Sequence, residues 1–305
     1  MSHASITTST LLRTLTGHTS PIRSIAWSPD GTFIATGSYA GNDNSARIWN
    51  AHTGQSLLTF ANQDEGINSV AWSPDSKHIA TGSYDNTARI WDAHTGQLLV
   101  ILDGHDMELV YSVAWSPDNT RIVTGSNDYS ARIWDAHTGQ LLRTLSQHAA
   151  AIHSVAWSPD GNQIATGSND ITACIWDMQS STPVLTLKRH TLYINEIAWS
   201  PDGTCLITGS GDKTTRLWDA QTGKLLGTLT GHTSSVTDVA WSPDSNYIAT
   251  SSQDATVRIW DTHTGKSLMI RNKAAAKVMS VTWSPDSTCI ATGNYDKTAQ
   301  IWELS

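Results

Sequence analysis

The feature that most constrains this chain is a unit of about 42 residues that occurs seven times. The string Trp-Ser-Pro-Asp marks each unit, with its Trp at positions 27, 72, 115, 157, 199, 241 and 283. A second Trp follows in every unit, at positions 49, 91, 134, 176, 218, 260 and 302, so the two sets account for all 14 Trp. A repeat that covers nearly all 305 residues predicts stacked copies of one structural unit and leaves no room for a second domain.

Each unit has the pattern of four short strands separated by turns. In the second unit the expected strands are residues 67–72, 79–83 and 88–91, followed by the Leu-rich segment after Gln97. Ser-Pro-Asp followed by Gly, Ser or Asn predicts a tight turn, because Pro fixes φ and the next residue tolerates the left-handed region. A four-stranded sheet of this size cannot stay folded alone, so we expect neighbouring sheets to cover one another.

Two dipeptides recur at fixed places in these units. Gly-His precedes the first strand at residues 17–18, 104–105 and 231–232, and Trp-Asp ends the third strand in five units. Together with the period, these features resemble the WD40 repeat family. The resemblance implies an all-β fold, a seven-bladed β-propeller of four-stranded antiparallel blades.

The two ends of the sequence predict how the ring closes. Residues 10–18 match residues 140–148, which contain the outer strand of the third unit, whereas the last unit stops soon after Trp302. We therefore expect the N-terminal strand to complete the last blade. The expected organisation is a disordered tail over residues 1–9 and one propeller domain over residues 10–305.

Polar residues also recur at fixed distances from the two Trp. An Asp lies six residues before every second Trp, a Thr lies nine residues after every first Trp, and a His precedes the first Trp in five units. By resemblance to the WD40 family, these residues form structural tetrads that tie loops to strands. The expected members are His18, Thr36, Asp43 and Trp49; Thr81, Asp85 and Trp91; His105, Thr124, Asp128 and Trp134; His148, Thr166, Asp170 and Trp176; His190, Thr208, Asp212 and Trp218; His232, Thr250, Asp254 and Trp260; and Thr292, Asp296 and Trp302.

The tetrad pattern has an alternative interpretation and two exceptions. Asp, His and a hydroxyl also make a catalytic triad, but a nucleophile occurs once, whereas this set recurs around the ring. We therefore expect it to serve folding. Gln63 and Ala274 replace the His in units 2 and 7, so those two units are expected to hold their loops less rigidly.

Positions that vary among otherwise similar units indicate a surface that is free to bind. The variable positions precede the first Trp by four and six residues, or immediately precede the recurrent Asp. In a WD40-like propeller they surround the mouth of the central channel. The expected partner-binding residues are Arg23, Asn68, Tyr84, Tyr111, His153, Tyr193, Asn195, Met279 and Tyr295.

These features predict a non-catalytic scaffold that binds a protein or peptide at the channel mouth. The sequence has no P-loop, HExxH or GxSxG motif, and we identify no unique carboxylate pair. The alternative is an enzyme, or a sensor of a small ligand or glycan, that uses the central channel. Side chains of the types enriched at interface hot spots favour the scaffold.

Composition narrows the classes of partner. The three Cys lack metal-ligand spacing, so no metal and no cofactor is expected. Net charge is −8, but 19 of the 27 acidic residues occupy recurrent positions, and no nucleic-acid surface is expected. No long apolar run occurs, so we expect no membrane partner and a cytoplasmic monomer.

Overall fold

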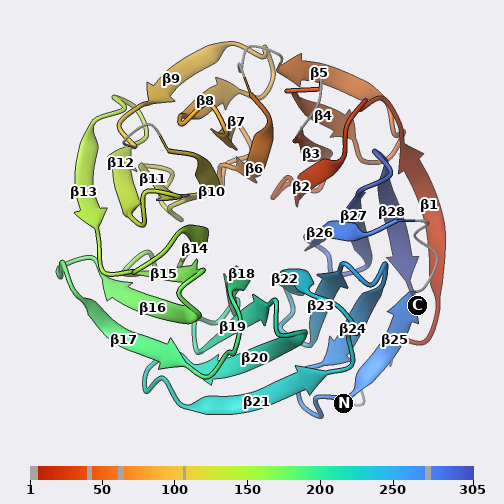
Figure 1. Cartoon of the computed structure of the whole chain (residues 1–305). Coiled ribbons are helices and arrows are strands. Elements are labelled where there is room, and N and C mark those ends of the chain that lie inside the picture. Colours follow the sequence, from red (N-terminus) through yellow and green to blue (C-terminus); the bar gives the residue numbers. More distant parts are fainter. Residues whose placement is uncertain (1–5, 40–42, 61–64, 106–107, 272–275) are drawn as a thin grey trace.

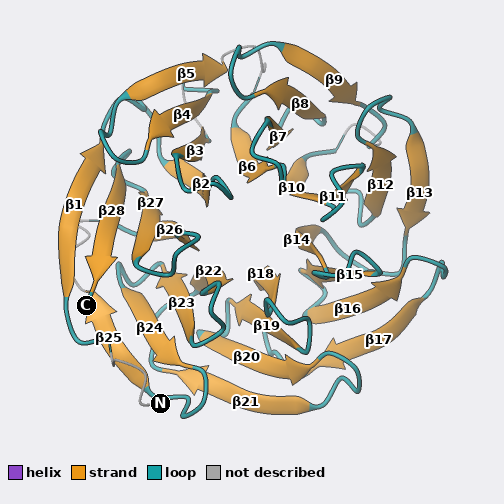
Figure 2. Ribbon diagram, turned by 180° about the vertical axis from the view of Figure 1, so that it is seen from behind, coloured by secondary structure: helices purple, strands orange, loops and turns teal. Residues whose placement is uncertain are grey.

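Seven four-stranded antiparallel sheets stand around a central channel in a computed structural model, which describes residues 6–39, 43–60, 65–105, 108–271 and 276–305. Figure 1 shows the sheets as the blades of a ring, and Figure 2 shows the same ring from behind. Blades 1 to 6 take four consecutive strands each, from β2–β5 to β22–β25, and blade 7 combines β26–β28 with β1. The expected seven-bladed propeller is confirmed.

The strands occupy four positions from the channel to the rim. The innermost strands are β2 (Ile22–Trp27), β6 (Ile67–Trp72), β10 (Val110–Trp115), β14 (Ile152–Trp157), β18 (Ile194–Trp199), β22 (Val236–Trp241) and β26 (Val278–Trp283). The second strands are β3 (Phe33–Ser38), β7 (His78–Ser83), β11 (Arg121–Ser126), β15 (Gln163–Ser168), β19 (Cys205–Ser210), β23 (Tyr247–Ser252) and β27 (Cys289–Asn294). The third strands are β4 (Ala46–Asn50), β8 (Ala88–Asp92), β12 (Ala131–Asp135), β16 (Thr172–Asp177), β20 (Thr214–Asp219), β24 (Val257–Asp261) and β28 (Ala299–Leu304). The outer strands are β5 (Ser56–Phe60), β9 (Leu98–Leu102), β13 (Leu141–Leu145), β17 (Pro183–Lys188), β21 (Leu225–Thr230), β25 (Ser267–Arg271) and β1 (Ser9–Leu15).

The N-terminal strand closes the ring, as the sequence predicted. In Figure 1 the red strand β1 lies outside the blue strand β28. The two strands pair antiparallel, with Ser9 opposite Leu304 and Leu15 opposite Ala299. Leu15 is 1% exposed and packs in the core between blades 7 and 1. Closure thus joins residues nearly 300 positions apart, and the N-terminal strand gives blade 7 the outer strand that it would otherwise lack.

The ordered chain begins earlier than the expected tail allowed. Ile6 is buried against Tyr247, Val257 and other apolar residues of blades 6 and 7. The main-chain N–H groups of residues 7 and 8 donate to the carbonyl of Ser305 at 2.8 and 2.7 Å. The prediction of a disordered tail was therefore wrong for residues 6–9, because an isolated Ile in a polar segment gave no periodic signal; residues 1–5 lie outside the described residues.

The Ser-Pro-Asp turns follow from their side-chain chemistry. In blade 1 the Ser28 hydroxyl donates to Asp30 Oδ1 at 2.6 Å and accepts from the N–H of Phe33 at 2.9 Å. The next residue, Gly31, has φ of 76°, and Ser76 and Asn119 occupy the same left-handed conformation in blades 2 and 3. These turns and those after the third strands lie on one face of the ring, so the channel mouth lies on the opposite face.

Neighbouring blades pack closely through small residues on the second strands. A Cβ added at Gly37 would lie 2.7 Å from Ile67 Cγ2 in the next blade. Ile67, Val70 and Trp72 of blade 2 belong to the same buried cluster as Ile48 of blade 1. The hydrophobic core is thus divided into similar layers between blades, which explains why single blades cannot stand alone. No helix in the described ranges is long and apolar enough to span a bilayer.

Candidate functional site: the channel and its mouth

Five blades contain a closed hydrogen-bond network at the predicted tetrad positions. The distance from His Nδ1 to Asp Oδ2 is 2.7–3.0 Å, and the distance from His Nε2 to Thr Oγ1 is 2.7–2.8 Å. The indole N–H of the second Trp donates to the same Thr hydroxyl at 2.8–2.9 Å. For a neutral imidazole one tautomer fits this network: Nδ1–H donates to the carboxylate, and Nε2 accepts from the hydroxyl. Every member thus has its partner inside the blade.

The pKa of the Asp carboxyl is lowered in the five tetrads that contain His, and blade 4 illustrates the physical reason. Burial alone would raise the pKa of Asp170, but hydrogen bonds from His148, Thr172 and the N–H of Ala149 outweigh it and lower the pKa below its ordinary value. His148 Nε2, in turn, is occupied by Thr166 at 2.7 Å. The side chains of the network thus bond to one another, so the geometry suits a structural clamp.

Blades 2 and 7 differ from this arrangement. In blade 2 the Asp85 carboxylate accepts from the guanidinium of Arg89 at 2.9 Å, and Trp91 still donates to Thr81 at 2.9 Å. In blade 7 Asp296 is exposed and accepts from the N–H and hydroxyl of Thr298 in its own turn. Gln63 and Ala274 lie outside the described residues. The less rigid loops expected in blades 2 and 7 therefore stay a prediction.

The predicted mouth residues fall into two groups, and the first is already engaged within the fold. Asn68 is 5% exposed and donates to the carbonyl of Val110 in the next blade at 3.3 Å. Asn195 makes the same kind of bond, at 2.7 Å to the carbonyl of Val236, and Met279 is 8% exposed. Placing Asn68 and Met279 on the binding surface was therefore wrong, because both side chains are buried and Asn68 joins neighbouring blades.

The second group surrounds Arg23 at the open end of the channel. The rings of Tyr111 and His153 are stacked with centroids 4.5 Å apart. Burial raises the pKa of Tyr84 and of Tyr111, and the positive charge of Arg23 opposes that rise in both. Burial, and then Arg23, lower the pKa of His153 to about 4, so this imidazole is neutral at pH 7.

Two exposed tyrosines extend the mouth outward, and a half-buried tyrosine, Tyr39, was missed from the sequence. Tyr193 packs its ring on Gly211, where an added Cβ would lie 2.6 Å from the ring carbon Cζ. The ammonium of Lys277 lies 5.8 Å from the ring centroid of Tyr295. Tyr39, in the loop lengthened in the first unit, interacts electrostatically with Tyr295, Arg23 and Tyr84. Its place inside an insertion hid it from the comparison of aligned positions.

A ring of polar side chains lines the channel below the mouth, three residues before each first Trp. Six of the seven members accept from a main-chain N–H of the next blade. For example, Val70 N–H donates to Ser24 Oγ at 3.1 Å, and Ile197 N–H donates to Ser154 Oγ at 3.1 Å. The ring residues are Ser24, Ser69, Ser112, Ser154, Glu196, Asp238 and Ser280. It joins the innermost strands around the channel.

Glu196 and Asp238 interrupt this ring of hydroxyls with two carboxyl groups in adjacent blades. Ser154 Oγ donates to Glu196 Oε1, while Asp238 Oδ2 accepts from Ser280 Oγ at 2.6 Å and from the N–H of Val281 at 2.9 Å. Burial raises the pKa of both groups, and the charge of Asp238 raises that of Glu196 further. The expectation that no unique carboxylate pair exists was therefore wrong. The sequence contained the signal for this pair, because two units have an acid at a position where the other five have Ser.

The channel offers little space beside these groups. Arg23, Tyr111, His153, Glu196 and Asp238 line a cavity of about 190 Å³. Pockets that hold drug-sized ligands usually measure about 300 to 1,000 Å³. Within the described part of the chain, no three His, Cys, Asp or Glu residues are grouped so that they could hold a metal ion.

Comparison with known families agrees with this architecture. The family model described as the echinoderm microtubule-associated protein second beta-propeller matches residues 110–275, just over half of the chain. The model of the WD domain, G-beta repeat, matches residues 9–50, 54–92 and 266–303. No curated protein matches the sequence. With its seven blades and these two matches, the chain belongs to the WD40-repeat family of β-propeller proteins.

Proposed function

We propose that this chain is a non-catalytic scaffold that binds a protein or peptide at the channel mouth. The WD40 β-propeller is generally a protein-interaction scaffold. The observation that carries the proposal is the cluster formed by Arg23, the stacked pair Tyr111–His153, and Tyr84. Arg23, Tyr111 and His153 lie near the start of innermost strands, and Tyr84 directly follows β7, so little ordering entropy opposes a partner.

The chemistry of this cluster suits a peptide with an aromatic or acidic side chain. Arg and Tyr are enriched among residues that dominate binding energy, because they combine large area with a polar group. Tyr193 and Tyr295, 37% and 47% exposed, extend the same surface away from the channel. The cavity below is too small for a bulky ligand, so the partner would cover the mouth.

The test is selection of peptides from a random displayed library on the wild-type protein. Binding of the selected peptides is then measured for Arg23→Ala, Tyr111→Ala and the control His137→Ala, which lies on the opposite face. Each mouth variant should weaken binding by about 1 to 3 kcal/mol, while His137→Ala binds like wild type. Peptides that bind all three variants alike, or lose affinity only with His137→Ala, would contradict the choice of face.

The carboxyl pair supports a second candidate, in which the channel takes up a small cationic or hydrogen-bonding molecule. Two carboxyl groups with raised pKa, Glu196 and Asp238, are unusual outside functional sites. The test is crystallography after soaking with guanidinium or ammonium ions, with the Glu196→Ser/Asp238→Ser variant as control. Density for the ion in the wild-type channel alone would support this candidate.

We also propose that the protein is a cytoplasmic monomer. Sedimentation velocity tests whether its mass is that of one chain.

A further inference from the structure

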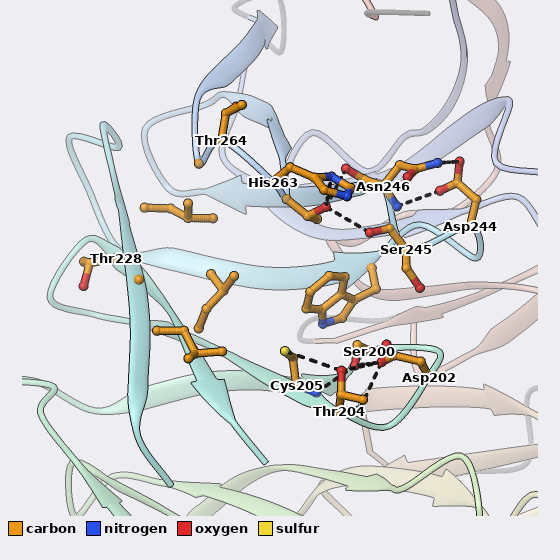
Figure 3. Close-up of a pocket in the computed structure, with 17 residues that line it drawn as sticks. Ser200, Asp202, Thr204, Cys205, Thr228, Asp244, Ser245, Asn246, His263 and Thr264 are labelled. Carbon is orange, nitrogen blue, oxygen red and sulfur yellow. Dashed lines mark hydrogen bonds between the residues drawn. The ribbon is translucent and has the colours of Figure 1, made fainter. Parts of the chain in front are cut away.

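A cleft of about 740 Å³ lies between blades 5 and 6, on the face opposite the channel mouth. Figure 3 shows Cys205 and Asp202 on one side of it and Asp244, Asn246 and His263 on the other. The corresponding cleft between blades 7 and 1 measures about 390 Å³. Because the blades repeat one design, the residues that fill the other clefts show what the larger one lacks.

The first difference is at Cys205, which begins the second strand of blade 5. In four other blades the equivalent residue covers the first Trp of the next blade with a planar group. The rings of Phe33 and Trp72, of His78 and Trp115, and of Tyr247 and Trp283 are stacked at 6.0–6.2 Å, and the guanidinium of Arg121 lies 5.6 Å from the ring centroid of Trp157.

Cys205 is too short to cover an indole in this way. The first Trp of the next blade, Trp241, is accordingly half-buried, as is Trp27 opposite Cys289. The other five first Trp residues are at most 9% exposed. The face of Trp241 is thus open to the cleft.

The second difference is at Gly227 in the outer strand β21. Four other blades have Leu58, Val100, Leu185 or Met269 at this position, and two have Arg13 or Arg143. No atom lies within 4 Å of a Cβ built on Gly227, so the space of a whole side chain is open.

The two arginines show what this position can hold. Arg13 Nε donates to the carbonyl of His52 at 3.0 Å, and Arg143 Nη1 donates to the carbonyl of Ser180 at 3.1 Å. Each arginine therefore reaches the turn after the third strand of the next blade. The equivalent turn of blade 6, residues 262–265, lines the cleft.

Charge in the cleft favours a cation. Asp202 and Asp244 line it from blades 5 and 6. Hydrogen bonds from Ser200 and Thr204 lower the pKa of Asp202, so its carboxylate is ionised at neutral pH. A cation above an indole face, beside carboxylates, gains both cation–π and Coulomb attraction.

We propose that the cleft between blades 5 and 6 binds an arginine side chain of a partner protein, with the guanidinium on the face of Trp241 and the aliphatic stem in the space beside Gly227. A guanidinium occupies both equivalent positions elsewhere in this ring. Arg121 places it over an indole, and Arg13 and Arg143 place it on the turns after third strands. This site is independent of the proposed binding at the channel mouth.

The experiment uses three capped tripeptides, acetyl-Gly-Xaa-Gly-amide, in which Xaa is arginine, lysine or citrulline. Binding to the ¹⁵N-labelled protein is followed by NMR at the indole N–H of Trp241, assigned with Trp241→Phe. The arginine peptide should shift this signal saturably. The citrulline peptide, which has the same shape without the charge, should bind at least tenfold more weakly, with lysine between them because it lacks the planar fork.

Two variants fill the cleft independently, and one serves as a matched control. Gly227→Arg supplies the arginine from the chain itself, and Cys205→Tyr covers Trp241 as Tyr247 covers Trp283; each should weaken binding of the arginine peptide at least tenfold. Thr144→Arg adds the same charge to an exposed position of another outer strand and should leave the affinity unchanged. Full affinity in both filled variants, or equal binding of the citrulline peptide, would overturn the proposal.

Discussion

Two sets of acidic side chains inside the propeller behave in opposite ways. The aspartates of the five tetrads that contain His, such as Asp170, have a lowered pKa, whereas the channel carboxyls Glu196 and Asp238 have a raised one. Burial pushes the pKa upward in both sets. The difference lies in the donors: Asp170 is bonded by His148, two groups of Thr172 and the N–H of Ala149. Glu196 is bonded by Ser154 and the N–H of Ile197 and lies near a second acid.

This comparison shows that burial alone does not decide whether a carboxyl group is stable in its ionised form. A carboxylate surrounded by donors stabilises the fold in its ionised form, and a carboxylate that shares a confined space with another acid stabilises it less as it ionises. The tetrads are therefore expected to be structural supports. The channel pair is expected to cost stability at neutral pH, which is typical of groups retained for a function.

The largest expected effect is the loss of one tetrad carboxylate. Asp170→Ala leaves His148 and turn N–H groups without their acceptor, which should lower the free energy of unfolding by about 2 to 4 kcal/mol. Asp296→Ala, which removes an exposed carboxylate bonded within its own turn, should cost about 1 kcal/mol or less. Denaturation by guanidinium chloride measures both. Equal losses in the two variants would break the distinction between tetrad and turn carboxylates.

Removal of the channel pair should have the opposite sign. Glu196→Ser/Asp238→Ser restores the hydroxyl found at the other five ring positions and should raise the free energy of unfolding at pH 7 by about 1 to 2 kcal/mol. Ser154→Ala, which removes an acceptor of the ring, should lower it by about 1 kcal/mol. If the double variant were less stable than wild type, the pair would itself be a structural support.

The pH dependence of stability should distinguish the two sets by about 1 kcal/mol. The folded pKa of Asp170 is lowered, so its contribution is present above the unfolded pKa of about 4 and is lost as the pH falls below it. The folded pKa of each channel carboxyl is raised, so its contribution is present below about pH 4 and is lost as the pH rises. Asp170→Asn should flatten the acid limb, and Glu196→Ser/Asp238→Ser should flatten the loss at higher pH. Melting temperatures from pH 3 to 9 measure both slopes, and unchanged slopes would contradict the assignment.

The smallest expected effect concerns the backbone of the tetrad turn. Ile171, which follows Asp170, has φ of 67°, a conformation that is costly for a β-branched residue. Asn86 occupies the same position in blade 2 with φ of 71°. Ile171→Asn should therefore raise the free energy of unfolding by about 0.5 to 1 kcal/mol in thermal denaturation. If the free energy of unfolding did not rise, the left-handed conformation of Ile171 would carry no measurable strain.

The repeated sequence was enough to predict four strands per unit and a last unit completed by residues 10–15, and its resemblance to the WD40 family implied the propeller. The reason is that each feature depends on local or periodic signals: Ser-Pro-Asp turns, alternating apolar residues and a missing outer strand in the last unit. The positions of the tetrad residues could also be predicted, since their spacing from the Trp residues is regular.

Only the tertiary structure decided which variable residues are accessible and which neighbours meet. Asn68 and Met279 vary among the units yet are buried, and Asn68 is bonded to the next blade. Ile6 finds its partners in blades 6 and 7, at the far end of the chain. Glu196 and Asp238 form a pair because residues one repeat apart face the same channel. Cys205 and Gly227 open one cleft because different strands of blade 5 face the same space. Such contacts depend on the shapes of both partners, whereas a periodic pattern describes each position alone.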